Sequence, residues 1–197
     1  MSLASFFGAM RGGQKQLREA IAGALFAIAI AASVDVVAQV AAFPEEIQAA
    51  YIHKFVGYVD WPPKVFSGPA TPIVVGVAGS DRMFQLVSSI AADRPVQGRP
   101  VEVRRLVKPD EGTNIHLVFV GKDAWRDLPV WAALSKERPM LVTTDAPQGV
   151  ERGAALAFVH SGERIRFEAS LPAAQMSGVR LSSRLLAVAE RVVGAGP

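Results

Sequence analysis

The sequence predicts a single α/β domain with a mainly parallel central sheet, helices on both faces, and a C-terminal β-hairpin followed by a helix. Apolar runs at 73–78 and 115–120, the second broken only by His116, are typical of strands buried on both faces of a parallel sheet. Stretches with helical spacing of apolar residues lie between such runs, which is the rhythm of an α/β layer. Over 164–169 charged and apolar residues alternate, which indicates a strand with one solvent-facing side.

The first element of the domain is a helix that begins at residues 43–46. Pro44 suits the first turn of a helix, and Glu45 and Glu46 are favourable at the positive end of the helix dipole. Apolar and aromatic residues then recur at three- and four-residue spacing, so one face of this helix is expected to be buried. Residues 61–63, Trp-Pro-Pro, end the helix, because proline cannot continue it and disfavours helix in the preceding residue.

Four short strands and two helices are expected in the middle of the chain. The strands are predicted at 73–78, 101–106, 115–120 and 140–143. Ser80-Asp81 is expected to cap a helix over 82–91, and Asp123 is expected to cap a helix over 125–134. The order strand, helix, strand, strand, helix, strand predicts a sheet that is mainly parallel.

The end of the chain predicts a hairpin and a last helix. Residues 154–160 and 164–169 are expected to pair as two strands joined by a turn at 161–163. Ser182-Ser183 is expected to cap a final helix that runs through Val193.

The N-terminus has the pattern of a secretory signal. Arg11, Lys15 and Arg18 precede an apolar stretch over 20–34, and small residues follow it. We therefore expect a signal peptide over 1–38, with cleavage near Ala38 or Ala42, and a mature domain over 43–193 in the periplasm. An uncleaved segment that anchors the protein in the inner membrane is the alternative, because the apolar stretch lengthens if it is counted through 35–42.

The composition is that of one folded domain without thiol chemistry. The 197 residues carry a formal charge of +3, and half of them are apolar. This near balance gives no electrostatic footprint for nucleic acid, so we expect no nucleic-acid partner. The chain has no cysteine, which excludes disulfides, thiol nucleophiles and Cys-based metal sites.

The sequence gives little support for catalysis. His53, His116 and His160 lie far apart and do not form a metal-ligand spacing. No serine lies in a G-x-S-x-G elbow, and no nucleophile, base and orienting group assemble, so we expect neither an enzyme nor a cofactor. His116 is better explained as a hydrogen-bonded core or strand-end residue.

A weaker set of residues indicates a small-molecule pocket. Ser80, Gly121 and Asp145 each follow a predicted strand, and parallel sheets bind ligands beyond the carboxyl ends of their strands. The turn at 76–81 lacks the spacing of a phosphate-binding loop, so an ordinary strand-to-helix turn is the better interpretation of it, and Ser80 is only a weak pocket candidate.

Two groups of residues are candidates for binding a protein partner. Lys54, Tyr58 and Trp61 are the most exposed candidates of an aromatic cluster whose other members are expected in the core. On the predicted strand 164–169, the charged face forms the second group, whose members are Arg164, Arg166 and Glu168. A solvated strand face without a partner is the simpler interpretation of the second group.

Three segments stand in a recognisable order and spacing. They are 47–55 leading to Trp61-Pro62, then 98–100 followed by 115–120, and finally 165–171 with 178–186. Together, from Glu45 to Ala189, they resemble the YfiR-like family of exported bacterial proteins. The resemblance implies a compact periplasmic α/β domain, often dimeric, so a homodimer is an open expectation. It also implies a regulator without catalysis that restrains a membrane-bound diguanylate cyclase by binding its periplasmic portion.

One position departs from the family pattern. Members often carry a cysteine just before the histidine of the central strand, where this chain has Ile115. A redox-gated version of the mechanism is therefore excluded, whereas Ile115 fits a buried strand well.

The leading prediction is thus a periplasmic regulator that binds a membrane sensor, expected to be a diguanylate cyclase, and lowers cyclic di-GMP signalling. A periplasmic small-molecule binding module is the alternative, and a hydrolase with an unrecognised site is a third hypothesis. The first two are compatible, since a ligand can gate partner binding.

Overall fold

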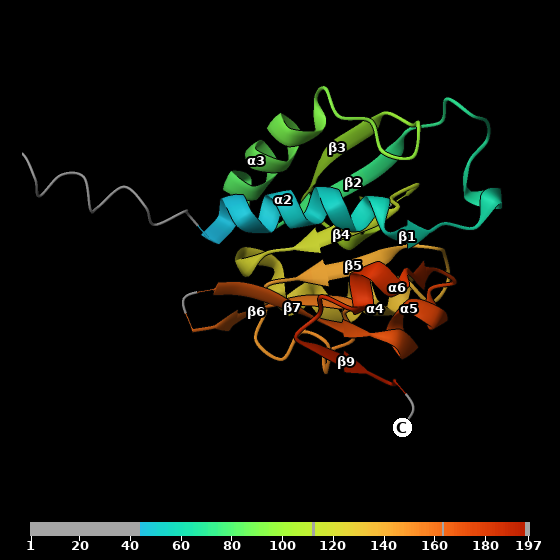
Figure 1. Ribbon diagram of the computed structural model, residues 1–197. Helices are drawn as coiled ribbons and strands as arrows, with labels where there is room; N and C mark the ends of the chain where they lie inside the picture. The colour runs from blue at the N-terminus through green and yellow to red at the C-terminus, as the bar shows by residue number, and fades with distance from the viewer. Residues whose placement is uncertain (1–43, 112, 163, 196–197) are drawn as a thin grey trace, which may run out of the picture. The chain divides into compact units, whose positions relative to one another are not determined.

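The structure, a computed structural model, describes residues 44–111, 113–162 and 164–195 (Figure 1). The predicted signal segment 1–38, with its cleavage sites near Ala38 and Ala42, lies outside the described residues. Within them the chain forms a mixed α/β layer with a mostly parallel sheet, as the sequence predicts.

The central sheet has seven strands in the order β3-β2-β4-β5-β6-β7-β9. The five strands from β3 to β6 are parallel, β7 is antiparallel to β6 as the predicted hairpin requires, and β9 is parallel to β7. A second sheet pairs β1 with β8, which the sequence did not predict. The strands are β1 (Val59–Asp60), β2 (Ile73–Ala78), β3 (Val101–Leu106), β4 (Leu117–Val120), β5 (Leu141–Thr144), β6 (Leu156–Ser161), β7 (Arg164–Ser170), β8 (Arg180–Leu181) and β9 (Arg191–Val193).

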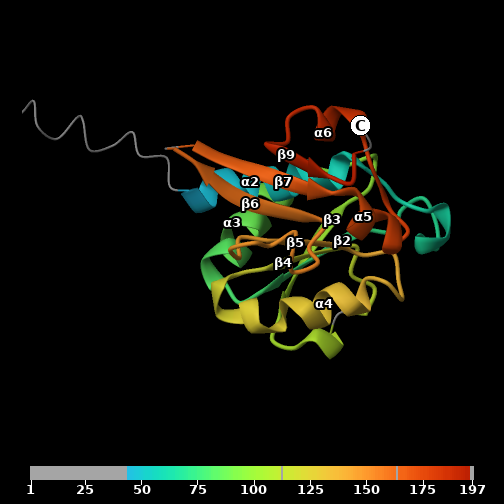
Figure 2. The same ribbon diagram turned by 90° about the horizontal axis from the view of Figure 1, so that it is seen from below.

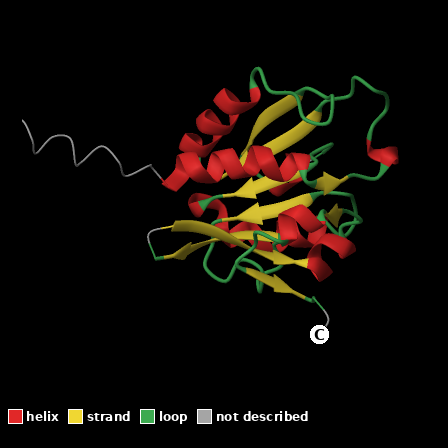
Figure 3. Ribbon diagram, in the orientation of Figure 1, coloured by secondary structure: helices red, strands yellow, loops and turns green. Residues whose placement is uncertain are grey.

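Helices cover both faces of the sheet, as predicted (Figures 2 and 3). Helices α2, α3 and α6 pack on one face, and α4 packs on the other. The α-helices are α2 (Pro44–Gly57), α3 (Asp81–Ala91), α4 (Leu128–Leu134), α5 (Leu171–Met176) and α6 (Ser183–Leu186). Three short 3-10 helices are η1 (Pro63–Val65), η2 (Pro109–Glu111) and η3 (Lys122–Asp127).

The position of β4 in the sheet explains why its sequence is apolar throughout. Leu117 and Phe119 belong to the core beneath α2 and α3, whereas Val118 and Val120 belong to the core beneath α4. Successive side chains of a strand point to opposite faces, so a strand that is covered on both faces needs an apolar residue at every position.

The predicted final helix over 182–193 is wrong. Ser182 does cap a helix, because its Oγ accepts the backbone N–H of Leu185, but that helix, α6, ends at Leu186. Arg191–Val193 instead form β9, which pairs with the edge of β7. Backbone hydrogen bonds to an open strand edge stabilise the extended form of this Val-rich segment, and this tertiary pairing overrides the helical spacing.

The predicted helix over 125–134 is divided in two. Asp123 does not cap it but lies inside η3. The residues at the N-cap positions of η3 and α4, Gly121 and Asp127, make no side-chain capping hydrogen bond. Pro129 stands in the first turn of α4, where its missing N–H costs nothing, so the α-helix begins only at Leu128. The predicted cap at Ser80 is confirmed, because its Oγ accepts the N–H of Met83 at 3.1 Å.

Candidate functional site

Charged side chains gather on the solvent-facing side of β7 and β9. The core beneath α4 contains no described residue of β7 or β9, so this half of the sheet face is not covered by the helix. On β7 the residues that face the opposite side, Ile165 and Phe167, are buried, and those between them are charged. We call this surface the charged strand face; its members are Glu151, Arg164, Arg166, Glu168, Glu190 and Arg191.

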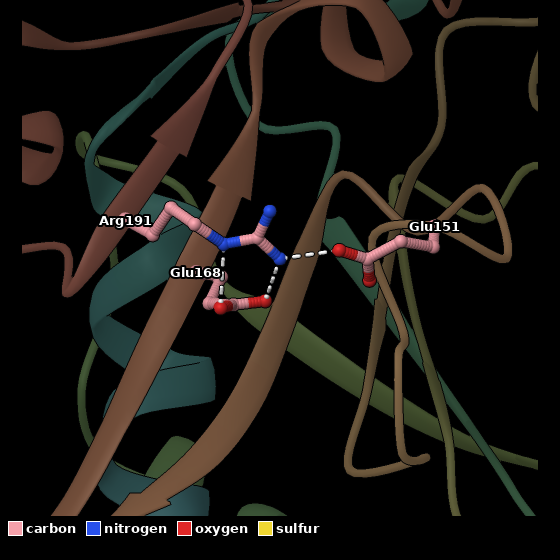
Figure 4. Close-up of polar contacts among 3 residues, drawn as sticks. All are labelled: Glu151, Glu168 and Arg191. Atoms are coloured by element: carbon pink, nitrogen blue, oxygen red, sulfur yellow. Dashed lines mark hydrogen bonds and ion pairs between the residues drawn. The ribbon is translucent and has the colours of Figure 1, made fainter.

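Arg191 forms the centre of the charged strand face (Figure 4). It lies opposite Glu168 in the register of β7 and β9. Its Nε and one terminal nitrogen donate to the two oxygens of Glu168, both at 2.7 Å, and that nitrogen also donates to Glu151 at 2.5 Å. The bonds to Glu168 and Glu151 raise the pKa of Arg191, and the bond to Arg191 lowers the pKa of Glu151. Such a two-point contact between planar groups fixes the position of β9 against β7.

The remaining members are less constrained. Arg166 lies 3.9 Å from Glu190, whose carboxylate also accepts a hydrogen bond from the hydroxyl of Ser161 at 3.2 Å. Arg164 is exposed and forms no ion pair with another described residue. Both oxygens of Glu168 are engaged by Arg191, whereas Arg164 forms no ion pair with a described residue and Arg166 only a long one, so the charges of these two arginines are the least engaged within the protein.

The other predicted partner group does not form one surface. Lys54 is exposed near the end of α2, and Tyr58, just beyond it, is 40% exposed. Trp61 was expected to be exposed but is only 8% exposed, because its Nε1 donates to the carbonyl of Val56 at 3.3 Å and its ring packs edge-on against His116. The structure therefore leaves Lys54 and Tyr58 available at this end of the domain.

The residues predicted for a small-molecule pocket are only partly brought together. Ser80 and Gly121 are in contact, since a Cβ on Gly121 would lie 3.0 Å from that of Ser80. Asp145 instead accepts a hydrogen bond from Nε1 of Trp125 at 2.7 Å, and burial raises its pKa. A cavity of about 450 Å³ beside Ser80 is lined by three aspartates and Arg105, and Asp145 is not part of it.

His116 has the structural role that the sequence predicts. It is buried just before β4, and its Nδ1 accepts the backbone N–H of Val74 at 3.0 Å. Burial, followed by the positive charges of Arg99 and Arg104, lowers its pKa, so the ring is held neutral. In the described part of the chain, no three His, Asp or Glu side chains gather in a way that could hold a metal ion.

The sequence did not predict three members of the charged strand face. Glu190 and Arg191 were assigned to a final helix, and Glu151 lies in the connection between β5 and β6. The sequence did contain one indication, because Arg191-Val192-Val193 has the β-branched character of a strand. Its pairing with β7 follows only from the folded arrangement.

A family comparison identifies the class of protein to which this fold and surface belong. The family model described as YfiR/HmsC-like matches residues 45–190, so the chain belongs to this family of periplasmic regulators. The family is regulatory rather than catalytic.

A solved structure shares the fold. It is a conserved domain protein from Vibrio cholerae O1 biovar El Tor strain N16961, with a TM-score of 0.51 and 15% sequence identity. The alignment covers 76% of this chain and 60% of that chain. No curated protein matches the sequence. Within the described residues, none of the helices has the length and apolar character that a bilayer crossing requires.

Proposed function

We propose that this protein binds the periplasmic portion of a membrane-bound diguanylate cyclase and restrains its activity, so that less cyclic di-GMP is made. Membership of a family of periplasmic regulators supports the class of function. The observation that carries the proposal is the charged strand face, an uncovered half of a sheet that presents charged groups on paired strands. Charge pairs across an interface give specificity and fast association, which suits a regulator that must find one partner.

The proposed mechanism is a shift of population. A protein that binds the inactive conformation of a sensor more tightly than the active one moves the equilibrium toward the inactive form. No bond is made or broken in this mechanism. The pairing of β7 with β6 holds the backbone of Arg164 and Arg166 in place before binding, and this lowers the entropy cost of association.

The contact residues of the proposal are Arg164 and Arg166. Both are accessible, and they lie next to each other on one face of β7 near the hairpin turn. They also border a small cavity with Ile47 and Tyr51 of α2, so an acidic partner segment with an apolar side chain fits this place. Lys54 and Tyr58 are a second contact region in the proposal, at the far end of α2.

The proposal is tested by deleting the gene and measuring cyclic di-GMP. Deletion is expected to raise the cyclic di-GMP level, and the wild-type gene is expected to restore it. The double variant Arg164→Glu/Arg166→Glu should fail to restore it although the protein accumulates normally. Arg126→Glu, which reverses an exposed arginine on η3, is the matched control and should restore the level. An unchanged cyclic di-GMP level after deletion, under several growth conditions, contradicts the proposal.

Export and oligomeric state are further parts of this proposal. Fractionation of cells is expected to place the processed chain in the periplasm, whereas recovery of the full chain in the membrane fraction would support the anchored alternative. Analytical ultracentrifugation of the purified protein tests the homodimer.

A further inference from the structure

A second cavity lies at the amino ends of the parallel strands, away from the cavity beside Ser80. Its volume is about 540 Å³, which is within the range of small-molecule sites. It is bordered by the residues that precede β2, β4 and β5, and by Arg104 of β3. We call it the amino-end cavity.

The lining of the amino-end cavity is basic. Lys64, Arg104 and Arg138 line it, and among the side chains that the structure describes no aspartate or glutamate does. Arg104 forms an ion pair with Glu102 through its Nε at 2.7 Å, and that pair does not use its two terminal nitrogens. The two terminal nitrogens of a guanidinium can hold a carboxylate or a phosphate at two points. The cavity beside Ser80 differs, because Asp81, Asp123 and Asp127 line it.

One lining residue of the amino-end cavity, His116, belongs to a stack of side chains that also holds the neighbouring loop. The guanidinium of Arg99 lies 3.9 Å from the ring centre of Phe66, and Phe66 stacks on His116 with ring centres 5.0 Å apart. Arg99 also donates to the carbonyls of Gly68, Pro69 and Thr71, at 2.6, 2.9 and 3.0 Å. These bonds hold the loop between η1 and β2 in one conformation, so the cavity is formed before a ligand binds.

The charges of Arg99 and Arg104 act on His116, which lines the cavity. After burial, the next electrostatic causes that lower the pKa of His116 are the charges of Arg99 and Arg104. A field that disfavours a proton on a lining residue favours a negative charge in the same place.

We propose that the amino-end cavity binds a small organic anion, with a carboxylate or phosphate group held by Arg104, Arg138 and Lys64. This site does not depend on the proposed cyclase partner, and it lies at the opposite end of the strands from the pocket that the sequence indicates.

The test is a calorimetric titration of the purified protein with citrate and, separately, with inorganic phosphate at constant ionic strength. Saturable binding of either anion is expected, and glucose should not bind. Binding of citrate alone assigns a carboxylate ligand, and binding of phosphate alone assigns a phosphate ligand. Saturable binding of neither anion overturns the proposal.

The residues are tested with a matched pair on one strand. Arg104→Gln is expected to raise the Kd at least tenfold, whereas Arg105→Gln, whose side chain borders the cavity beside Ser80, should leave it within twofold. Equal weakening by both variants would mean unspecific attraction and would overturn the site. Lys64→Gln, with Lys122→Gln as its control, gives the same comparison at exposed positions if Arg104→Gln fails to fold.

A site-specific readout is the titration of His116 by NMR. An anion bound in the cavity should raise the pKa of His116, because a nearby negative charge favours the protonated ring. His53 and His160 lie outside the lining and should not respond.

Discussion

The strands β4 and β7 belong to the same sheet and differ in what lies above them. Both faces of β4 are covered, and all four of its residues are buried. One face of β7 lies outside the core beneath α4, and its residues alternate between charged and apolar. The comparison teaches that the covering helix, rather than the strand itself, decides whether a position must be apolar.

The pKa values of ionisable groups shift toward the neutral form beside the covered strands and toward the charged form on the charged strand face. His116 and Asp145 lie next to covered strands, and burial is the first cause that moves the pKa of each toward its neutral form. On the charged strand face, hydrogen bonds to opposite charges come first and move Arg191 and Glu151 toward their charged forms. Loss of water dominates where helices cover the sheet, and pairing dominates where solvent reaches it.

The largest effect is expected for the helix that makes the covered half. Leu128 of α4 is fully buried, so Leu128→Ala should lower the free energy of unfolding by about 2–5 kcal/mol. Val130, two residues along and 48% exposed, is the control, and Val130→Ala should change it by less than about 0.5 kcal/mol. Urea denaturation measures both. Equal losses in the free energy of unfolding for the two variants would contradict the distinction between covered and exposed positions.

A smaller effect is expected at His116. His116→Phe keeps an aromatic ring against Phe66 but removes the acceptor of the Val74 N–H, at a cost of about 1–3 kcal/mol at pH 7.5. The folded pKa is lower than the ordinary value of 6.5, so the folded state binds the proton less tightly than the unfolded chain. Stability contributed by the neutral ring is therefore complete above pH 6.5 and is lost as the pH falls toward the folded pKa.

Thermal unfolding between pH 7.5 and 5 checks this dependence. The fall in stability should be weaker in the His116→Phe variant than in the wild type. His160→Phe, at an exposed position, is the control and should retain the wild-type pH profile.

The next effect is expected on the charged strand face. Arg191→Gln removes the two-point contact with Glu168 and the bond to Glu151, and because these groups are solvated, the loss of global stability should be smaller than that at His116. Faster hydrogen exchange at the amides of β9 is the expected local effect.

The lowered pKa of Glu151 stabilises the fold above pH 4.5, and this contribution is lost in acid as the pH falls through the folded pKa. The variant should lack this part of the acid dependence, and an unchanged exchange rate in β9 would show that the backbone pairing alone holds the strand.

The smallest effect is expected at Asp145. Its folded pKa is raised by burial, so the folded state binds the proton more tightly and stability increases as the pH falls toward the folded pKa. Asp145→Asn keeps an acceptor for Nε1 of Trp125 and removes the cost of the buried charge, so a slight stabilisation at pH 7 is expected. Calorimetry measures it, and a clear destabilisation would mean that the charge itself is required at this position.

Much of the fold followed from local patterns. The apolar runs predicted β2 and β4, the alternation over 164–169 predicted β7, and the cap at Ser80 predicted the start of α3. These features depend on residues near one another in the chain, and so they can be recognised without the folded structure. The resemblance to the YfiR-like family was carried by the same segments and is confirmed.

The candidate surfaces depended on distant residues. Arg164, Arg166 and Glu168 were found from the strand pattern, but Arg191 was not, because its segment reads as helix until it meets the edge of β7. Trp61 was expected on the surface but is buried against His116. The sequence could not predict this burial, because the two residues are far apart in the chain. The basic amino-end cavity likewise collects Lys64, Arg104 and Arg138 from three separate segments.

The sequence by itself thus determined the central strands, the first helices and which strand has a solvent-facing side, because hydrophobic periodicity and helix caps are local properties. Only the tertiary structure decided which half of the sheet face α4 leaves open, that residues 191–193 extend the sheet, and where the basic side chains converge. These features arise from pairing and packing between residues that are distant in the chain, and local preferences do not specify such contacts.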